Sequence, residues 1–278
     1  MTELLYFLNV AFSTGQSTLG RQYAVKGGSA NNFNINQALS GTAVFLIVCV
    51  LSGFTIHLPT FLFGALYGVF LCLSMYTGFK ALAMGPLALT SIIASFSLII
   101  PFIFGITVWS EPLTLLGVIS IILLLSAIVL MNLKKEGGVT LKWLTFALLT
   151  LLTKGVCSII QKFHQLYYPK QYQTEFMLFA LACVFVMLSV AKSFAKGKGA
   201  FKFSLLGLFS GLLNGGTNYI VLYLAATEKA SVLFPVVSVA KVIAVGIVGR
   251  IIYKERLKPL QITGIACGLT AIVLLNIK

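Results

Sequence analysis

The chain has 278 residues, of which 59% are hydrophobic and only 9% are charged. A soluble domain carries about 25% charged residues, so the composition excludes a water-soluble protein. Basic residues outnumber acidic ones by 20 to 6, but they lie mostly in short stretches between apolar runs, where they set topology and contact lipid headgroups. We therefore expect membrane lipid, and no nucleic acid, as a partner.

Apolar runs separated by Gly, Pro, Asn or Lys predict ten helices, each about as long as the ~20 residues that a spanning helix needs. The expected fold class is an all-α polytopic membrane protein with ten transmembrane helices. Ten spans leave about 78 residues for loops and tails, so no long soluble domain fits. In chain order, the helices are expected at 3–22, 33–52, 60–82, 86–108, 113–132, 142–164, 174–193, 203–225, 231–252 and 258–277.

The chain also contains an internal repeat. Moved by 144 positions, segment 127–134 matches segment 271–278 at six of eight residues, and Glu111 pairs with Glu255 in a chain that has only six acids. Each half would hold five spans, an odd number, so the second half enters the membrane in the opposite sense, as in an inverted-topology repeat. We expect two five-helix repeats, 1–135 and 136–278.

Two related segments, 86–130 and 230–274, carry a resemblance to a known family. Ten short spans in two halves, with a glutamate opening the fifth and tenth spans, resemble the EamA-type branch of the drug/metabolite transporter superfamily. The resemblance implies that each half is an EamA-like repeat and that a cavity between the halves carries a small metabolite. The chain departs from the family pattern where Ser110 and Lys254 stand in place of the glycine that usually precedes each glutamate.

Two lysines, Lys154 and Lys241, lie in the middle of predicted spans. Lysine at the centre of a membrane helix costs about 2.5–3.5 kcal/mol on insertion scales, so such a residue faces the protein interior and has a partner. The functional interpretation is a cationic cavity for a carboxylate or phosphate group. The structural alternatives are a lysine capped by backbone carbonyls, or one whose head reaches the membrane interface.

Polar residues at helical spacing extend this candidate substrate-binding site. Ser13 and Gln16 share one face of the first span, and Asn214 and Asn218 share one face of the eighth. Ser13 matches Lys154 at a shift of 141 positions, and Ser97 matches Lys241 at a shift of 144. Such stripes can also hold helices together. We predict that all seven residues line one cavity that is positive on one wall and lined by hydroxyl groups on the other.

The other residues that could carry out chemistry do not form a pattern typical of an enzyme active site. There is no aspartate, the five cysteines lie singly in apolar runs, and all six glutamates map to span ends or loops. We expect no catalytic residue, no cofactor and no metal. We expect Glu111 and Glu255 to have a structural role, because a carboxylate near a helix N-terminus is favoured by the helix dipole.

These observations predict a secondary transporter that moves a small anionic or zwitterionic metabolite by alternating access, without ATP. The candidate substrates are amino acids and organic or phosphorylated anions. The alternatives are a lipid-linked sugar flippase and an intramembrane enzyme acting on a phospholipid or polyprenyl phosphate. We expect a monomer or homodimer in a cell membrane, in the first place the bacterial plasma membrane.

Overall fold

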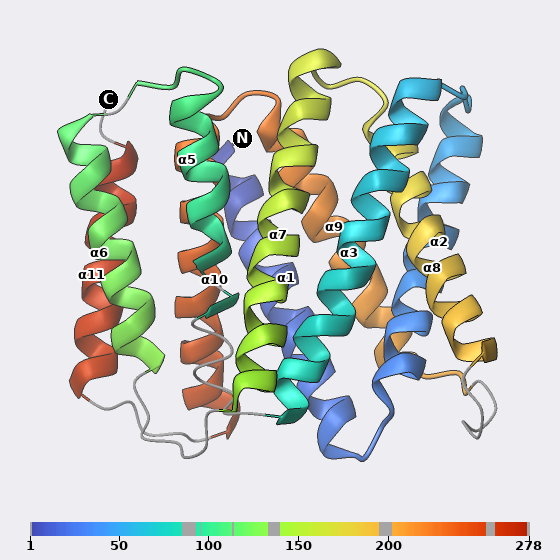
Figure 1. Cartoon of the computed structure of the whole chain (residues 1–278), viewed down its shortest axis with the longest axis horizontal. Coiled ribbons are helices and arrows are strands. Elements are labelled where there is room, and N and C mark those ends of the chain that lie inside the picture. Colours follow the sequence, from blue (N-terminus) through green and yellow to red (C-terminus); the bar gives the residue numbers. More distant parts are fainter. Residues whose placement is uncertain are drawn as a thin grey trace. The chain divides into compact units, whose positions relative to one another are not determined.

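The computed structural model describes residues 2–84, 93–94, 96–112, 114–132, 140–194, 202–253 and 259–276. Within these ranges the chain forms ten α-helices and one short 3-10 helix, and no strand (Figure 1). The expected all-α class is confirmed. The elements are α1 (Thr2–Val25), α2 (Ala30–Ser52), α3 (Leu58–Met84), η1 (Phe96–Leu98), α5 (Ile99–Thr107), α6 (Leu115–Asn132), α7 (Leu141–Tyr167), α8 (Gln173–Phe194), α9 (Leu205–Ala225), α10 (Ala230–Tyr253) and α11 (Pro259–Asn276).

In the part of the chain that the structure describes, five helices are long and apolar enough to cross a membrane: α2, α3, α7, α8 and α9. Large apolar side chains such as Ile47, Val50 and Leu51 of α2 are exposed. A continuous exposed apolar face of this kind is unfavourable in water and suits contact with lipid. The chain is therefore a multi-pass membrane protein. The helix expected at 86–108 is seen only as η1 and α5, because residues 85–92 and 95 lie outside the described residues.

Side-chain caps explain where two of the long helices begin. The Ser29 hydroxyl accepts a hydrogen bond from the Asn32 amide at the start of α2, and the Ser204 hydroxyl does the same for the Gly207 amide at the start of α9. These bonds satisfy backbone donors that the first helical turn leaves unpaired. The Asn36 side chain of α2 also accepts from the Ser204 amide at 3.2 Å, which ties the start of α9 to α2.

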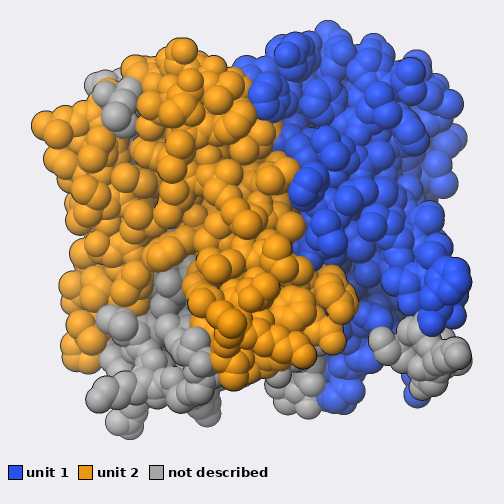
Figure 2. Space-filling model, in the orientation of Figure 1, with its two compact units in different colours: residues 1–75, 160–227 blue, residues 76–159, 228–278 orange. Residues whose placement is uncertain are grey.

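The helices group into two compact units, coloured separately in Figure 2. Unit 1 comprises residues 1–75 and 160–227, and unit 2 comprises residues 76–159 and 228–278. Each unit therefore draws helices from both of the predicted sequence halves. Helix α7 contributes its first part to unit 2 and its last part to unit 1.

Within unit 1, glycines allow α3 to approach α8 closely. A Cβ atom built on Gly64 would lie 2.9 Å from the carbonyl oxygen of Phe176, and one on Gly68 would lie 2.6 Å from that of Ala180. A real side chain does not fit at such distances. Small residues four positions apart are a common means of bringing the backbones of two membrane helices together.

Helix α9 approaches α2 in the same way. A Cβ atom on Gly207 would lie 3.3 Å from the carbonyl oxygen of Phe33, and one on Gly211 would overlap the carbonyl oxygen of Gln37. These contacts correspond to those between α3 and α8 at a constant shift of 143 positions. Adding 143 to the numbers of the α3 glycines gives the numbers of the α9 glycines. Subtracting 143 from the numbers of their α8 partners, Phe176 and Ala180, gives the α2 partners, Phe33 and Gln37.

The core of unit 2 forms where α6 packs on α11 and α5 packs on α10. Leu98, at the end of η1, is buried against Val239 and Ile243 of α10, and Leu124 of α6 joins the same cluster. Ala127 and Ala271, which correspond at the 144 shift, are both fully buried. The short η1–α5 segment is thus fixed by apolar contacts close to the middle of α10.

Candidate functional site

Lys154 is the central residue of the 27-residue helix α7, with 13 residues on each side. Many protein atoms surround it, yet its side chain is exposed. The next residue, Gly155, packs directly on Ile100 of α5, because a Cβ atom there would overlap the Ile100 side chain. The close approach of α7 to α5 therefore fixes the position of Lys154 within unit 2.

Lys241 has an equivalent place in α10. It follows the first 11 residues of this 24-residue helix, is surrounded by protein, and is half-buried. Val239 and Ile243, two positions to either side, pack into the cluster that contains Leu98. The η1–α5 segment thus contacts both of the helices that carry the central lysines.

Lys154 and Lys241 both belong to unit 2, and each lies near the middle of its helix. Among the described residues, no hydrogen bond or ion pair is found for either ammonium group. Desolvated charges in proteins are ordinarily paired and hydrogen-bonded. Two accessible mid-helix cations without an anionic partner among the described residues are a candidate anion-binding site.

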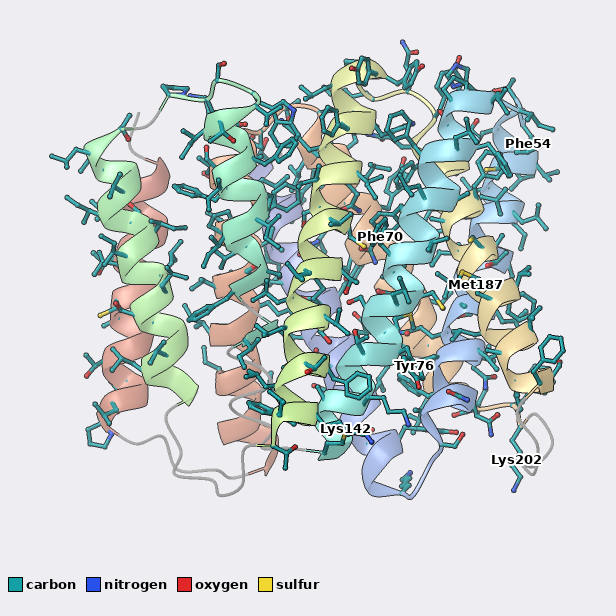
Figure 3. All side chains as sticks on the ribbon, in the orientation of Figure 1. Phe54, Phe70, Tyr76, Lys142, Met187 and Lys202 are labelled. Atoms are coloured by element: carbon teal, nitrogen blue, oxygen red, sulfur yellow. The ribbon has the colours of Figure 1, made fainter. Side chains whose placement is uncertain are left out.

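Other lysines of the chain differ from this pair. Lys142 and Lys202 lie at helix ends, where their heads can reach the membrane interface (Figure 3). Lys162 is buried, but its ammonium group donates to the carbonyl oxygen of Ala225 at 3.0 Å, at the C-terminal end of α9. A positive charge is favoured at that end of a helix, so Lys162 has the structural role that the central pair lacks.

The predicted polar residues of α1 and α9 lie in unit 1. Asn218 donates to the side-chain oxygen of Asn214 at 2.9 Å and accepts from the Tyr67 hydroxyl at 2.8 Å. Ser13 is buried and donates to a carbonyl of its own helix, while Gln16 is half-buried. The structure therefore brings Asn214 and Asn218 together.

Ser97 belongs to unit 2 with the two lysines. It lies in η1, half-buried, next to Leu98, whose side chain packs on α10 two positions from Lys241. A single cavity that contains all seven predicted residues stays a prediction.

A polar network in unit 1 could not be foreseen from the sequence. The Thr60 hydroxyl lies 2.9 Å from Nδ1 of His57 and 3.0 Å from Nε2 of His164, so it joins two histidines 107 positions apart. His164 is fully buried. The network continues from His164 to Gln165, whose side-chain oxygen accepts from the Gln173 amide at 2.8 Å. No spacing pattern in the sequence indicates this arrangement.

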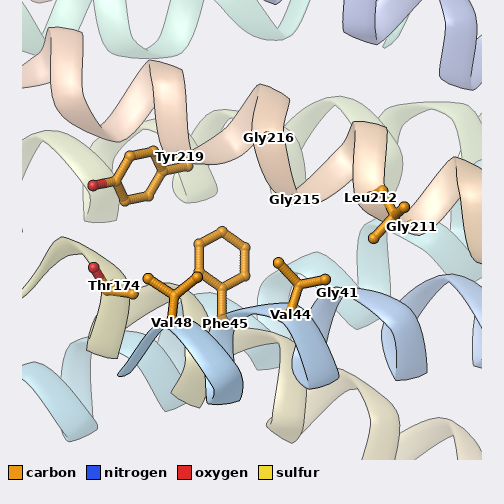
Figure 4. Close-up of a pocket in the computed structure, with 10 residues that line it drawn as sticks. All are labelled: Gly41, Val44, Phe45, Val48, Thr174, Gly211, Leu212, Gly215, Gly216 and Tyr219. Carbon is orange, nitrogen blue, oxygen red and sulfur yellow. The ribbon is translucent and has the colours of Figure 1, made fainter. Parts of the chain in front are cut away.

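Unit 1 also contains an apolar cavity of about 320 Å³ between α2, α8 and α9 (Figure 4). Glycines of α9 and apolar side chains of α2 form most of its wall, and the Thr174 and Tyr219 hydroxyl groups lie at one end. Val44, Val48 and Leu212 on its rim are exposed. No charged side chain lines this cavity, so its chemistry differs from that of the lysine pair.

Glu111 has a structural role of the expected kind, but at a different helix. Its two carboxylate oxygens accept from the amides of Ala230 and Ser231 at 2.8 and 2.9 Å, so it caps the N-terminus of α10. It approaches so closely over Gly105 that a Cβ atom on this glycine would lie 2.7 Å from the carboxylate. Glu255, its partner in the repeat, lies outside the described residues.

Replacing Glu111 with Gln should destabilise the protein by about 1.5–3 kcal/mol, because an amide can accept only one of the two charge-assisted bonds. Thermal unfolding of the purified protein in detergent measures the effect. Glu3→Gln, in the first turn of α1, is the matched control and should cost about 0.3–1 kcal/mol or less. Equal stability of the two variants would contradict the capping role.

Comparison with known proteins supports the architecture. One solved crystal structure superposes with a TM-score of 0.80, covering 99% of this chain and 96% of the other, with 14% of residues identical. At this identity the likeness shows a common fold and nothing about activity. No protein-family model and no curated protein sequence matches the chain.

Proposed function

We propose that the protein is a secondary membrane transporter of small anionic or zwitterionic metabolites, in the manner of EamA-type drug/metabolite transporters. The observation that carries the proposal is the pair of mid-helix lysines, Lys154 and Lys241, which are accessible and without an anionic partner among the described residues. Such a pair is costly to maintain in a membrane protein unless it binds something negative.

The proposal includes ten spans arranged as two inverted five-helix repeats. The contacts of Gly64 and Gly68 with α8 match the contacts of Gly207 and Gly211 with α2. This match supports the symmetry, because a two-fold axis exchanges each helix with its repeat partner. The pairing of α2 with α8, α5 with α10 and α6 with α11 supports it as well. Inverted repeats give a transporter two related conformations around one site, as alternating access requires.

The substrate site would bind an anion through direct contacts to both ammonium groups. Lysine presents a compact charge with three donors, which suits carboxylate and phosphate oxygens. No carboxylate of the sequence lies near a span centre, so a buried acid has no part in coupling transport to protons. Facilitated transport, exchange, and proton coupling through a lysine are compatible with this arrangement.

Flux into sealed liposomes that contain the purified protein tests the proposal. We expect uptake of at least one labelled probe among succinate, phosphate and alanine, and at least a tenfold loss in both Lys154→Gln and Lys241→Gln. Lys142→Gln, on the same helix as Lys154 but at its end, should retain wild-type flux. Wild-type uptake by both central variants, once folded and inserted, would mean that the lysines are structural.

A lipid-linked sugar flippase is the second candidate. The apolar cavity of unit 1, with Val44 and Val48 exposed at its rim, favours a lipid chain as an occupant. In the same liposomes, a flippase would move a fluorescent lipid-linked sugar between leaflets and leave the three soluble probes outside.

A further inference from the structure

We infer that the apolar cavity of unit 1 binds a phospholipid of the bilayer, with one acyl chain along the cavity and the phosphate group at Lys170. The inference goes beyond the proposed transport of soluble metabolites. It holds for either candidate function, because it concerns the lipid that surrounds the protein.

The depth of the cavity matches one leaflet of a bilayer. Gly41, on its wall, is the central residue of α2, with 11 residues on each side. Val48, at the other end of the cavity, lies four residues before the end of α2 at Ser52 (Figure 4). The helix rises about 16 Å from Gly41 to Ser52, and half of the hydrocarbon core of a bilayer is about 15 Å thick. The cavity therefore runs from the middle of the span toward one membrane surface, as an acyl chain does.

The cavity opens on the surface of the protein that contacts lipid. Val44, Val48 and Leu212 line it and are 39, 40 and 42% exposed. Ile47 and Leu51 continue the exposed apolar face of α2 beside it. Water finds few hydrogen-bond partners in an apolar space, and an empty space loses the dispersion contacts of its walls. An acyl chain from the adjoining bilayer supplies these contacts without needing a hydrogen bond.

Polar groups follow the cavity in the order that a phospholipid requires. The hydroxyl groups of Thr174, the second residue of α8, and of Tyr219 lie at the end that is nearer the membrane surface (Figure 4). Tyr223 is one helical turn beyond Tyr219, and the Lys170 ammonium group lies 5.6 Å from the centre of the Tyr223 ring. Apolar walls, hydroxyl groups and a cation thus correspond to the acyl chain, its ester and the phosphate group.

The chemistry of Lys170 suits this last position. Lys170 is exposed, in the connection between α7 and α8. Lysine offers three donors on a compact charge, a good match for phosphate oxygens, and basic residues beside a membrane surface attract lipid headgroups. Its contact with the Tyr223 ring holds the charge at the end of α9.

Filling the cavity tests the position of the acyl chain. Native mass spectrometry of the detergent-purified protein counts the molecules of added phosphatidylglycerol that stay bound. We expect one in the wild type and at least tenfold lower occupancy in Val48→Trp, because the indole ring takes the place of the chain. Ile47→Trp, an exposed neighbour on α2 that does not line the cavity, is the matched control and should keep the wild-type occupancy.

Thermal unfolding of the same samples shows whether each variant is folded. Leu212→Trp fills the cavity from α9 and replaces Val48→Trp if that variant does not fold. Wild-type occupancy in a folded variant with a filled cavity would overturn the inference.

Titration with lipids that share their acyl chains tests the role of Lys170. The probes are phosphatidylglycerol, phosphatidylethanolamine and a diacylglycerol with an uncharged sugar headgroup. We expect the wild type to bind the phospholipids at least tenfold more tightly than the glycolipid, and Lys170→Gln to lose this preference. Lys229→Gln, which changes an exposed lysine in the α9–α10 connection, should keep it.

The two phospholipids distinguish the headgroups. Glu175 follows Thr174 in the first turn of α8, so tighter binding of phosphatidylethanolamine would assign a contact of its ammonium group to this carboxylate. Equal binding of the glycolipid and both phospholipids by the wild type would overturn the assignment of the phosphate group to Lys170.

Discussion

Adding one methyl group to Gly211 is expected to destabilise unit 1 by about 3 kcal/mol, the upper end of the usual cost of overpacking. The Cβ atom of Gly211→Ala would overlap the backbone carbonyl of Gln37 and the side chain of Ser40. A backbone group cannot turn aside as a flexible side chain can, so α9 must move away from α2. Thermal unfolding in detergent, followed by a thiol-reactive or intrinsic fluorescence signal, measures the loss.

Gly20→Ala is the matched control for this experiment. Gly20 is also helical and partly buried, but its Cβ atom would meet only the Phe33 ring at 3.7 Å, an ordinary contact. The control should be neutral or slightly stabilising, because alanine is favoured over glycine in helices. Gly68→Ala, at the equivalent contact of α3 with α8, should resemble Gly211→Ala. A Gly211→Ala protein as stable as the control would show that the two helices are less closely packed.

Replacing Lys241 with Glu should abolish anion flux and yet stabilise the empty protein by about 2 kcal/mol. In the proposed site the new carboxylate faces Lys154, so repulsion between two cations becomes attraction between opposite charges. Charges several ångströms apart interact by roughly this amount at an effective dielectric constant near 20. Transport and thermal unfolding are measured together. A lysine that serves only structure would give the opposite result, with stability falling.

The reverse variant and the double variant complete a charge cycle. Lys154→Glu should behave as Lys241→Glu does, since either change creates one opposite-charge pair. Combining both changes places two carboxylates together and should remove the gain in stability. If the double variant were as stable as either single one, the two side chains would not interact.

Much of the fold could be predicted because the apolar runs are long and their ends are marked. The expected ends at residues 52 and 225 coincide with the observed ends of α2 and α9. The start of α2 was expected at 33 but lies at Ala30, because the polar residues Asn31 and Asn32 are already helical behind the Ser29 cap. A hydropathy pattern does not reveal a helical first turn made of polar residues, although a cap residue can stabilise such a turn.

The candidate site was only partly accessible to such reasoning. Lys154 and Lys241 stand out in the sequence because charge is rare and costly inside apolar runs. The partners of Glu111 do not stand out, since Ala230 and Ser231 bind it through backbone amides that every sequence provides. The grouping of helices into two units was equally invisible, because each unit takes consecutive helices from both halves of the chain.

The network around Thr60 has a consequence for where its hydrogen atoms reside. The Gln165 side-chain oxygen accepts from the Lys170 backbone amide and from Gln173, so its NH₂ group must point at Nδ1 of His164. That nitrogen is therefore an acceptor, and His164 is the neutral tautomer with its hydrogen on Nε2. Its Nε2–H donates to Thr60, which leaves the Thr60 hydroxyl free to donate to His57. The Lys170 amide thus fixes the donor and the acceptor of each hydrogen bond from the α7–α8 connection to the start of α3. Each group in this chain accepts from the group before it and donates to the next.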